Sequence, residues 1–529
     1  MRRLPWLEAE PIRVFHGSVR DCYNSNLSSH EWTEDDDLPY LASIKKLAPS
    51  YKTLYYLADW MQVGTVPSRW GIIKHNPRQR SERERRTNVT FIEQKAGLPA
   101  TVSQITSVQQ FEQTMDGLSI TAAPFQKLAR IFIIEDLSRA IVEHLGSRFG
   151  IDPLFFREQI NDRIWQGTGS LEATTPDLYA TKKRRKWFRT RNVRLRYHQS
   201  NQSFQASRQE TDSFNVYRRA DDDRSHWEFQ DAKGAIISTT RTKTNIWIGE
   251  DKSCPNVTIG IVLVDPTVSH GFPMWYDRAN WLPISDVASS ISTPLAPSGS
   301  WYKDITHMTV LYPWFDSSLS AHALDLRRIV LPPLYTVCAE WLIVCEYVKT
   351  RLGQVEWMME MPALFVARGP EIDRALKKLN VWRRQVPAWR DMIHETLDQS
   401  IPAAKRLTLH ANFKSDDEAF EDIEADFKHI LHTLDRLQAR VDRLSDRGNA
   451  EMQLEAARQS LAESHDLARL TWLATIFVPL TFMSGIFSMT DDVASLKGTY
   501  RIYFAAAIPV AVVSLIIASG DGGVLLTRV

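Results

Sequence analysis

The sequence predicts an α+β cytosolic domain followed by long α-helices and a C-terminal two-helix transmembrane hairpin. Short β-branched runs closed by turn formers alternate with helical stretches before residue 320. After it, apolar residues recur at a three-and-four spacing. Two apolar runs without a formal charge lie near the end of the chain. The expected divisions are 1–120, 121–320, 321–466, 467–520 and a short tail at 521–529.

Composition excludes several classes of protein. The 64 basic and 63 acidic residues nearly cancel, so no net field attracts nucleic acid, and we expect no nucleic-acid partner. The four cysteines form no C-x-x-C pair, which disfavours a disulfide framework or structural zinc and favours a reducing compartment. The sequence has no Gly-rich phosphate loop, H-E-x-x-H sequence or nucleophile elbow. We therefore expect neither an enzyme nor a cofactor.

Residues 1–120 predict an irregular region, because prolines and aromatic residues interrupt any regular period. Its basic run at 78–86, RQRSERERR, is interpreted as a solvated loop, with a membrane-surface or nuclear-import role as the alternatives.

Residues 121–320 predict a mixed α/β domain. A strand is expected around Arg130–Ile134, followed by a helix with Asp136 as its N-cap and Gly146 near its end. A second helix should begin near Asp152, with Pro153 at its first position, where a missing N–H costs nothing. Further short, β-branched segments that end at turn formers predict strands at 192–197, 244–249 and 257–266.

Two other segments of this domain stand out. The basic run at 182–191, KKRRKWFRTR, encloses Trp187 and Phe188, and cations interleaved with aromatic residues can contact phosphates or lipid headgroups. A Ser- and Pro-rich segment at 285–300 predicts a mobile linker.

The region 321–466 predicts long helices. Two long candidates cover 324–361 and 371–399, and they are interrupted by Pro332, Pro333, Pro362 and Pro370. A coiled-coil-like seam follows from 416, formed by apolar residues three and four apart: Phe420, Ile423, Phe427, Ile430, Leu434, Leu437, Val441 and Leu444. We expect the chain to turn at Gly448 and to return as the second arm of an antiparallel helical hairpin.

The region 467–520 predicts two membrane spans at about 470–488 and 502–518. Leu470–Phe487 carries no formal charge and would be about 27 Å long as a helix, close to the thickness of a hydrocarbon core. The alternative is a pair of buried helices in a large soluble protein. Because no apolar signal-peptide core follows Arg2 and Arg3, we expect the bulk of the chain, and both termini, to lie in the cytosol.

The first span has a mixed face, whose members follow a three-and-four spacing: Leu467, Leu470, Ala474, Phe477 or Val478, Thr481, Ser484 or Gly485, and Ser488. Small residues on such a face can serve helix packing alone. The other interpretation is a wall that faces water, because Asp491 and Asp492 follow at its polar end. If several copies surround an axis, these carboxylates form a ring that concentrates cations.

The segment IFVPLTFMSGIFSM, Ile476 to Met489, resembles the first membrane helix of the CorA-like magnesium transporter family, in particular its divergent fungal members. Pro479, Leu480, Thr481, Phe482, Gly485 and Met489 lie at matching places. The order of a large α/β domain, long helices and two spans is also similar to that family.

The resemblance implies a CorA-like homopentamer in the plasma membrane or in an organellar membrane. It would conduct Mg²⁺ or another divalent cation along an axis lined by first spans. Leu467, Leu470, Thr481 and Gly485 fall on family pore positions. The family's Gly-Met-Asn signature is replaced by Ser488, Met489 and Thr490, which we expect to line the same path. The alternative function is a membrane-anchored scaffold or sensor with this fold but no conduction. No sequence motif identifies the ligands of a regulatory metal site.

Overall fold

The computed structural model describes residues 38–65, 76–118, 128–160, 177–216, 218, 220–223, 234–274, 299–314, 324–360, 368–408, 417–488 and 496–522. They divide into two compact units. Unit one combines Met1–Glu356 with Asn380–Asp442, and unit two combines Trp357–Leu379 with Arg443–Val529. The expected linker at 285–300 falls outside the described residues up to 298.

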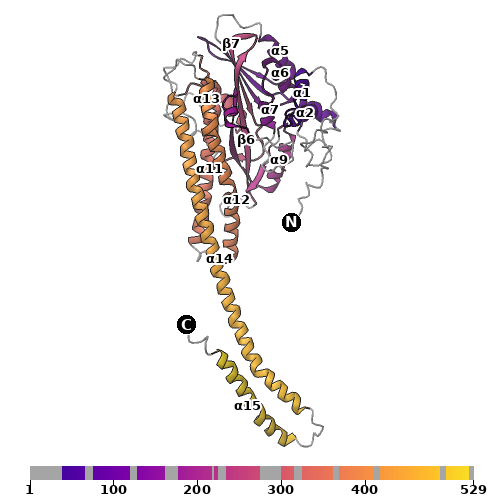
Figure 1. The fold of residues 1–529 in the computed structure, drawn as a ribbon, viewed down its shortest axis with the longest axis vertical. Coiled ribbons are helices and arrows are strands. Elements are labelled where there is room, and N and C mark those ends of the chain that lie inside the picture. Colours follow the sequence, from indigo (N-terminus) through magenta and orange to yellow (C-terminus); the bar gives the residue numbers. More distant parts are fainter. Residues whose placement is uncertain are drawn as a thin grey trace. The chain divides into compact units, whose positions relative to one another are not determined.

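Unit one is built on an eight-stranded mixed sheet (Figure 1). Its strands are β1 (Val89–Lys95), β2 (Thr101–Ile105), β3 (Leu128–Glu135), β4 (Trp187–His198), β5 (Ala220–Asp223), β6 (Ile236–Asp251), β7 (Cys254–Val264) and β8 (Phe272–Pro273). The order is β2-β1-β3-β7-β6-β4-β8, and β5 pairs with β6. Only β3 and β7 run parallel among the paired strands that the structure describes. The three central strands expected from β-branched runs are confirmed as β4, β6 and β7, each longer than its apolar centre.

Helices cover both faces of the sheet (Figure 1). One layer contains α1 (Pro39–Leu47), α2 (Leu54–Val63), α5 (Val108–Gly117), α6 (Arg139–Phe149) and α7 (Pro153–Ile160). The other contains α10 (Trp301–Leu311), the unit-one parts of α11 (Arg327–Glu360) and α12 (Arg368–Glu395), the π-helical turn η9 (Thr396–Ser400), α13 (Ile401–Thr408) and the start of α14 (Asp417–Phe487). The short helices α4 (Pro77–Glu84), α8 (Tyr179–Lys182) and α9 (Asn201–Ser213) complete the unit.

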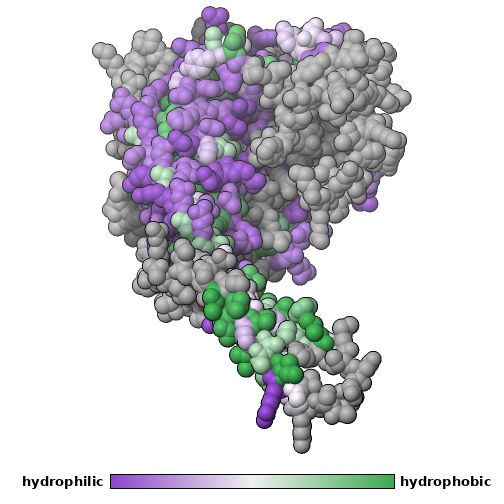
Figure 2. Space-filling model, turned by 60° about the horizontal axis from the view of Figure 1, so that its bottom comes forward, coloured by the Kyte–Doolittle hydropathy of each residue, from purple (hydrophilic) through white to green (hydrophobic). Residues whose placement is uncertain are grey.

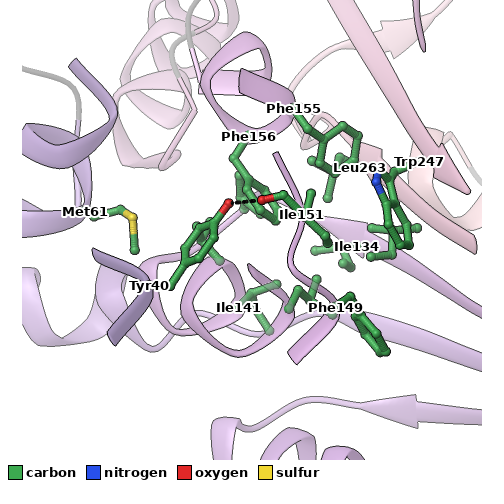
Figure 3. Packing of buried hydrophobic residues seen from close by; sticks show 14 of the residues in the cluster. Tyr40, Met61, Ile134, Ile141, Phe149, Ile151, Phe155, Phe156, Trp247 and Leu263 are labelled. Atoms are coloured by element: carbon green, nitrogen blue, oxygen red, sulfur yellow. Dashed lines mark hydrogen bonds between the residues drawn. The ribbon is translucent and has the colours of Figure 1, made fainter. Parts of the chain in front are cut away.

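Strand alternation divides apolar side chains between the two layers. Phe132 and Ile134 of β3 pack with Ile261 and Leu263 of β7 in the core beneath α1, α2, α6 and α7. Figure 3 shows Ile134 and Leu263 in this core. On the opposite face, Gly260 lies directly beneath Ile329 of α11, where a Cβ would approach that side chain to 2.8 Å. The sheet is therefore buried on both sides, as its apolar strands require.

The helix after β3 begins and ends later than the sequence predicts. Asp136 is not its N-cap, because Ser138 holds that place and Asp136 adopts a positive φ of 51°. The Asp136 carboxylate instead accepts hydrogen bonds from the backbone N–H groups of Asn215 and Val216. Gly146 does not end the helix either, since Gly150 does so with a φ of 61°. Gly146 lies inside α6 because the Tyr40 ring packs against it.

Residues 38–118 differ from the irregular region expected for 1–120. They contain α1, α2, α4, β1, β2 and α5, and both strands belong to the main sheet. The basic run at 78–86 lies largely in α4 rather than in a loop. Arg83 is buried and donates to the backbone carbonyls of Phe214 and Asp212. This run therefore joins two parts of unit one. The prediction of a solvated loop is wrong because the partners of Arg83 are distant in the sequence and cannot be inferred from the charge pattern.

The second basic run also serves internal contacts. Trp187 and Phe188 are both buried on β4. Arg189 lies between Glu158 of α7, at 3.1 Å, and Glu395 of α12, at 2.7 Å. Arg191 also pairs with Glu395. These arginines hold the two helical layers against the edge of the sheet.

The apolar seam is confirmed, since all eight seam side chains from Phe420 to Leu444 are buried. The turn expected at Gly448 is wrong, because α14 continues as one helix of 71 residues to Phe487. A Cβ at Gly448 would lie 2.7 Å from a methyl carbon of Leu376. Close approach of the α12 side chain, rather than a chain reversal, accounts for this glycine.

Candidate functional site

The apolar end of α14 differs from the other long apolar helix in its burial. Among the described residues, two helical stretches are long and apolar enough to cross a membrane: Arg327–Trp357 in α11 and Glu418–Ile486 in α14. The most apolar part of the first is 78% buried, whereas that of the second is 0% buried. α11 is thus a core helix of a folded unit. The end of α14 exposes its hydrophobic side chains, which Figure 2 shows in green.

α15 (Leu496–Gly522) follows α14 in unit two and contains a shorter apolar stretch, Tyr500–Ser514. The two helices lie side by side (Figure 1), and the Tyr503 hydroxyl donates to the Leu480 carbonyl at 3.3 Å. The α15 residues that are at least half-buried form a stripe of small or hydroxyl-bearing side chains: Tyr503, Ala506, Ala507, Ala511 and Ser514. Small side chains at this spacing allow two helix backbones to approach closely.

The matching stripe on α14 consists of the half-buried residues in its apolar end, Thr475, Ile476, Pro479, Leu480 and Met483. Pro479 has no amide hydrogen to donate to the Thr475 carbonyl, and it faces the partner helix rather than open solvent. A proline in an apolar helix is tolerated where neighbouring groups compensate for the missing hydrogen bond. This stripe therefore identifies the side of α14 that α15 covers.

The residues expected to line an ion path lie on the other side of α14. Leu467 and Leu470 are each 63% exposed, and Thr481, Gly485 and Ser488 are also exposed. At about 100° per residue, their stripe is centred about 180° from the stripe that α15 covers. The helix thus presents one face to its neighbour within the chain and brings these five residues together on the opposite face.

Hydroxyl groups on this helix satisfy their donors internally. Thr471 donates to the Leu467 carbonyl and Thr481 donates to the Phe477 carbonyl, at 2.8 and 2.7 Å. A hydroxyl that donates to its own helix keeps its lone pairs as acceptors. The exposed face of α14 therefore offers acceptor oxygens, which suit the water molecules around a cation.

The remaining predicted site residues, Met489, Thr490, Asp491 and Asp492, lie outside the described residues, in 489–495. Among the residues that the structure describes, no group of three or more His, Cys, Asp or Glu side chains is placed to hold a metal ion. Tyr503 and the small stripe of α15 also contribute to this arrangement, although no role was predicted for them from the sequence. The recurrence of alanine at 507 and 511 is a signal that could have identified this contact.

Residues 346–519 match the family model described as CorA-like Mg2+ transporter protein. This segment is similar to the CorA-like transporter domain. It extends from the end of α11 through α12, α13 and α14 to most of α15, so the resemblance seen in Ile476–Met489 is confirmed. Among solved structures, the chain is similar to the CorA magnesium transporter from Methanocaldococcus jannaschii, with 11% identity and a TM-score of 0.38 over 81% of this chain and 96% of that one. No curated protein matches the sequence.

Proposed function

We propose that this chain conducts a divalent metal ion across a membrane, with α14 and α15 as its two spans. The observation that carries the proposal is the placement of the expected path residues. They share the α14 face that α15 leaves open, inside the segment that matches the CorA-like family model. If the α14 face opposite α15 contacted only lipid, its hydroxyl groups and glycine would not stabilise the helix there.

The open face of α14 requires further copies of the chain in order to become a path. We propose a homopentamer, in which five α14 helices surround an axis and α15 forms an outer layer. Thr481 and Ser488 would then face the axis, and Leu467 and Leu470 would form an apolar constriction on the same side. A Cβ at Gly485 would meet no heavy atom within 4 Å, which leaves room for a hydrated ion or a neighbouring helix.

The chemistry of this face suits a cation that keeps its water. Mg²⁺ loses its hydrating water reluctantly, so a path for it must accept hydrogen bonds from that water. The Thr481 oxygen donates its own hydrogen to the Phe477 carbonyl and keeps its acceptor sites. Ser488, Met489 and Thr490 take the place of the family signature, and hydroxyls there would act in the same way. The ion is therefore magnesium or another divalent cation.

Asp491 and Asp492 are proposed as the groups that attract cations to the mouth of the path. Two carboxylates from each copy would form a ring, whose field is strongest at low ionic strength. Both termini are placed in the cytosol, and the plasma membrane is the proposed location. Replacing both aspartates by asparagine should lower flux more at low than at high salt. Asp466→Asn is the matched control, because its side chain is 78% exposed on α14 and lies before the span.

The test is ion flux in proteoliposomes that contain the purified chain, measured for magnesium, cobalt, nickel and zinc. Single cysteines at Thr481, Ser488 and Phe482 are then treated with a positively charged methanethiosulfonate reagent. A fixed positive charge on the path should reduce flux about tenfold or more at 481 and 488. Phe482 is the matched control, because it is 66% exposed on the same helix but lies between the two stripes.

Block at Thr481 and Ser488 but not at Phe482 supports the proposed path. Equal block at all three positions, or none at any of them, contradicts it. The treated wild-type chain corrects for its native cysteines, of which Cys338 and Cys345 are buried. Light scattering of the same preparation measures the oligomer. A pentamer that passes none of the four ions would overturn conduction and favour the scaffold or sensor instead.

A further inference from the structure

A cavity of about 230 Å³ lies in unit one at the edge of the sheet. Its walls come from α7, α8, β4, η9 and α13, so both helical layers contribute. Tyr179, Trp187, Phe188, Pro402 and Ala403 supply apolar surface. The basic run at 182–191 forms one side of it, so the cavity gives that run a role beyond internal ion pairs.

The acidic groups that line the cavity are mostly engaged by arginines. Glu158 pairs with Arg185 at 3.5 Å and with Arg189 at 3.1 Å. Glu395 pairs with Arg189 and Arg191. Burial alone would raise the pKa of Glu395, but the two guanidinium groups outweigh it and hold that pKa below its usual value. Both carboxylates are engaged by arginine side chains, so neither is available for a further cation.

Three cationic side chains on the cavity wall do not form such ion pairs with the described carboxylates. Within the described ranges, Lys182, Lys183 and Arg406 have no carboxylate at ion-pair distance. Arg406 donates to the Arg185 carbonyl at 2.5 Å, which keeps its guanidinium at the cavity. The cavity thus carries a local excess of positive charge in a chain that is nearly neutral in total.

The π-helical turn on the cavity wall has an identifiable cause. Pro402 has no amide hydrogen for the carbonyl of Asp398, four residues earlier, and its ring would clash with that carbonyl in an α-helix. The chain widens there into η9, and the Tyr179 hydroxyl donates to the Asp398 carbonyl at 3.2 Å. Ser400 of the same turn donates to the Arg189 carbonyl at 2.5 Å. Short π-helical segments of this kind frequently occur at functional sites.

We propose that this cavity binds a small phosphate ester. Its phosphate is placed between Lys182, Lys183 and Arg406, and its organic group contacts Tyr179 and Pro402. Cations without carboxylate partners favour an anion, and arginine and lysine are the usual partners of phosphate. The apolar share of the wall favours an ester over inorganic phosphate.

The size of the cavity limits the ligand. Drug-sized ligands occupy pockets of about 300–1,000 Å³, so this space suits a phosphate with one small organic group. Such a ligand would add a connection between α8 and β4 on one side and η9 and α13 on the other, which hydrogen bonds from Tyr179, Ser400 and Arg406 already join. The same chemistry occurs in a soluble metabolite and in the headgroup of an anionic lipid, and the experiment below separates the two.

The experiment is calorimetric titration of the purified full chain in detergent with phenyl phosphate, inorganic phosphate and phenol. Phenyl phosphate should bind about tenfold more tightly than either fragment, since it satisfies both parts of the wall. The double variant Lys182→Gln with Lys183→Gln should weaken its binding about tenfold or more. Lys186→Gln is the matched control, because it removes a cation from the same run at a residue that does not line this cavity.

Weaker phenyl phosphate binding in the double variant but not in Lys186→Gln, with an unchanged thermal midpoint, supports the site. Equal affinity in the wild type, the double variant and the control overturns it, as does the absence of phenyl phosphate binding at about 1 mM. A further titration with dihexanoyl phosphatidate assigns the source. Tighter binding than phenyl phosphate, lost in the same variant, identifies a lipid headgroup, and weaker binding identifies a soluble ester. Because the readout is binding, the result does not depend on whether the chain conducts ions.

Discussion

Replacing Gly146 by alanine should destabilise unit one, although alanine is the better helix former. A Cβ at this position would lie 2.4 Å from two atoms of the Tyr40 ring. That ring cannot move aside freely, because its hydroxyl donates to the Ile151 carbonyl at 2.7 Å (Figure 3) and both groups are buried. The Tyr40 amide is also fixed, at 2.6 Å from the Glu143 carboxylate.

The magnitude follows from three opposing effects. Alanine gains about 1 kcal/mol over glycine in a helix interior. Overpacking a tight contact costs about 1–3 kcal/mol, and losing the buried tyrosine hydrogen bond costs about 1–3 kcal/mol more. The net expectation is a loss of about 1–5 kcal/mol, the two costs less the gain in helix propensity. Gly353→Ala is the control, because the nearest atom to its Cβ, on Arg440, is 3.8 Å away.

The assay is thermal unfolding of the detergent-solubilised chain, followed by tryptophan fluorescence. Gly146→Ala should lower the midpoint by about 2–4 °C for each kcal/mol lost, whereas Gly353→Ala should leave it unchanged or raise it. In a Tyr40→Leu background the cost of Gly146→Ala should disappear, since the clashing ring is absent. Equal stability of Gly146→Ala and Gly353→Ala would contradict the claim that the Tyr40 ring excludes a side chain at position 146. The same conclusion follows if Gly146→Ala is equally destabilising in the Tyr40→Leu background.

Three further predictions concern charge. Glu395→Gln should lower the melting midpoint at pH 7, and the gap to the wild-type midpoint should shrink as pH falls below 4.5, because a carboxylate whose pKa is lowered in the folded state stabilises it only while ionised. A gap that stays constant with pH would contradict this. Burial, aided by the nearby Arg196, lowers the pKa of His198 from 6.5 to about 4. The neutral imidazole therefore stabilises the folded chain above pH 6.5, and this stabilisation should be lost as pH falls from 6.5 towards 4. His198→Asn should flatten the plot of melting midpoint against pH in that range. Arg440→Glu should lower the midpoint because it places a carboxylate beside Glu356, and adding Glu356→Arg should recover about 1 kcal/mol of stability by forming the ion pair in reverse; a double variant whose two effects simply add would contradict this.

The sequence predicted the elements whose cause is local. The strands β4, β6 and β7 follow from β-branched runs, and the seam from Phe420 to Leu444 follows from a spacing that any helix must obey. The apolar character of the end of α14 and of α15 follows from composition alone. The face of α14 that carries Thr481 and Ser488 was also predictable, because a helical period fixes which residues share a side.

Only the tertiary structure decided what those patterns contact. Gly146 and Gly448 look alike as helix ends in sequence, and each lies inside a helix because a distant side chain, Tyr40 or Leu376, packs where a Cβ would be. The sequence predicts a solvated loop for the basic run at 78–86 and phosphate or lipid contacts for the run at 182–191, yet Arg83 and Arg189 have partners far along the chain. Periodicity depends on neighbours three or four residues away, whereas the role of a glycine, the pairing of a charge and the side of α14 covered by α15 depend on residues that meet only after folding.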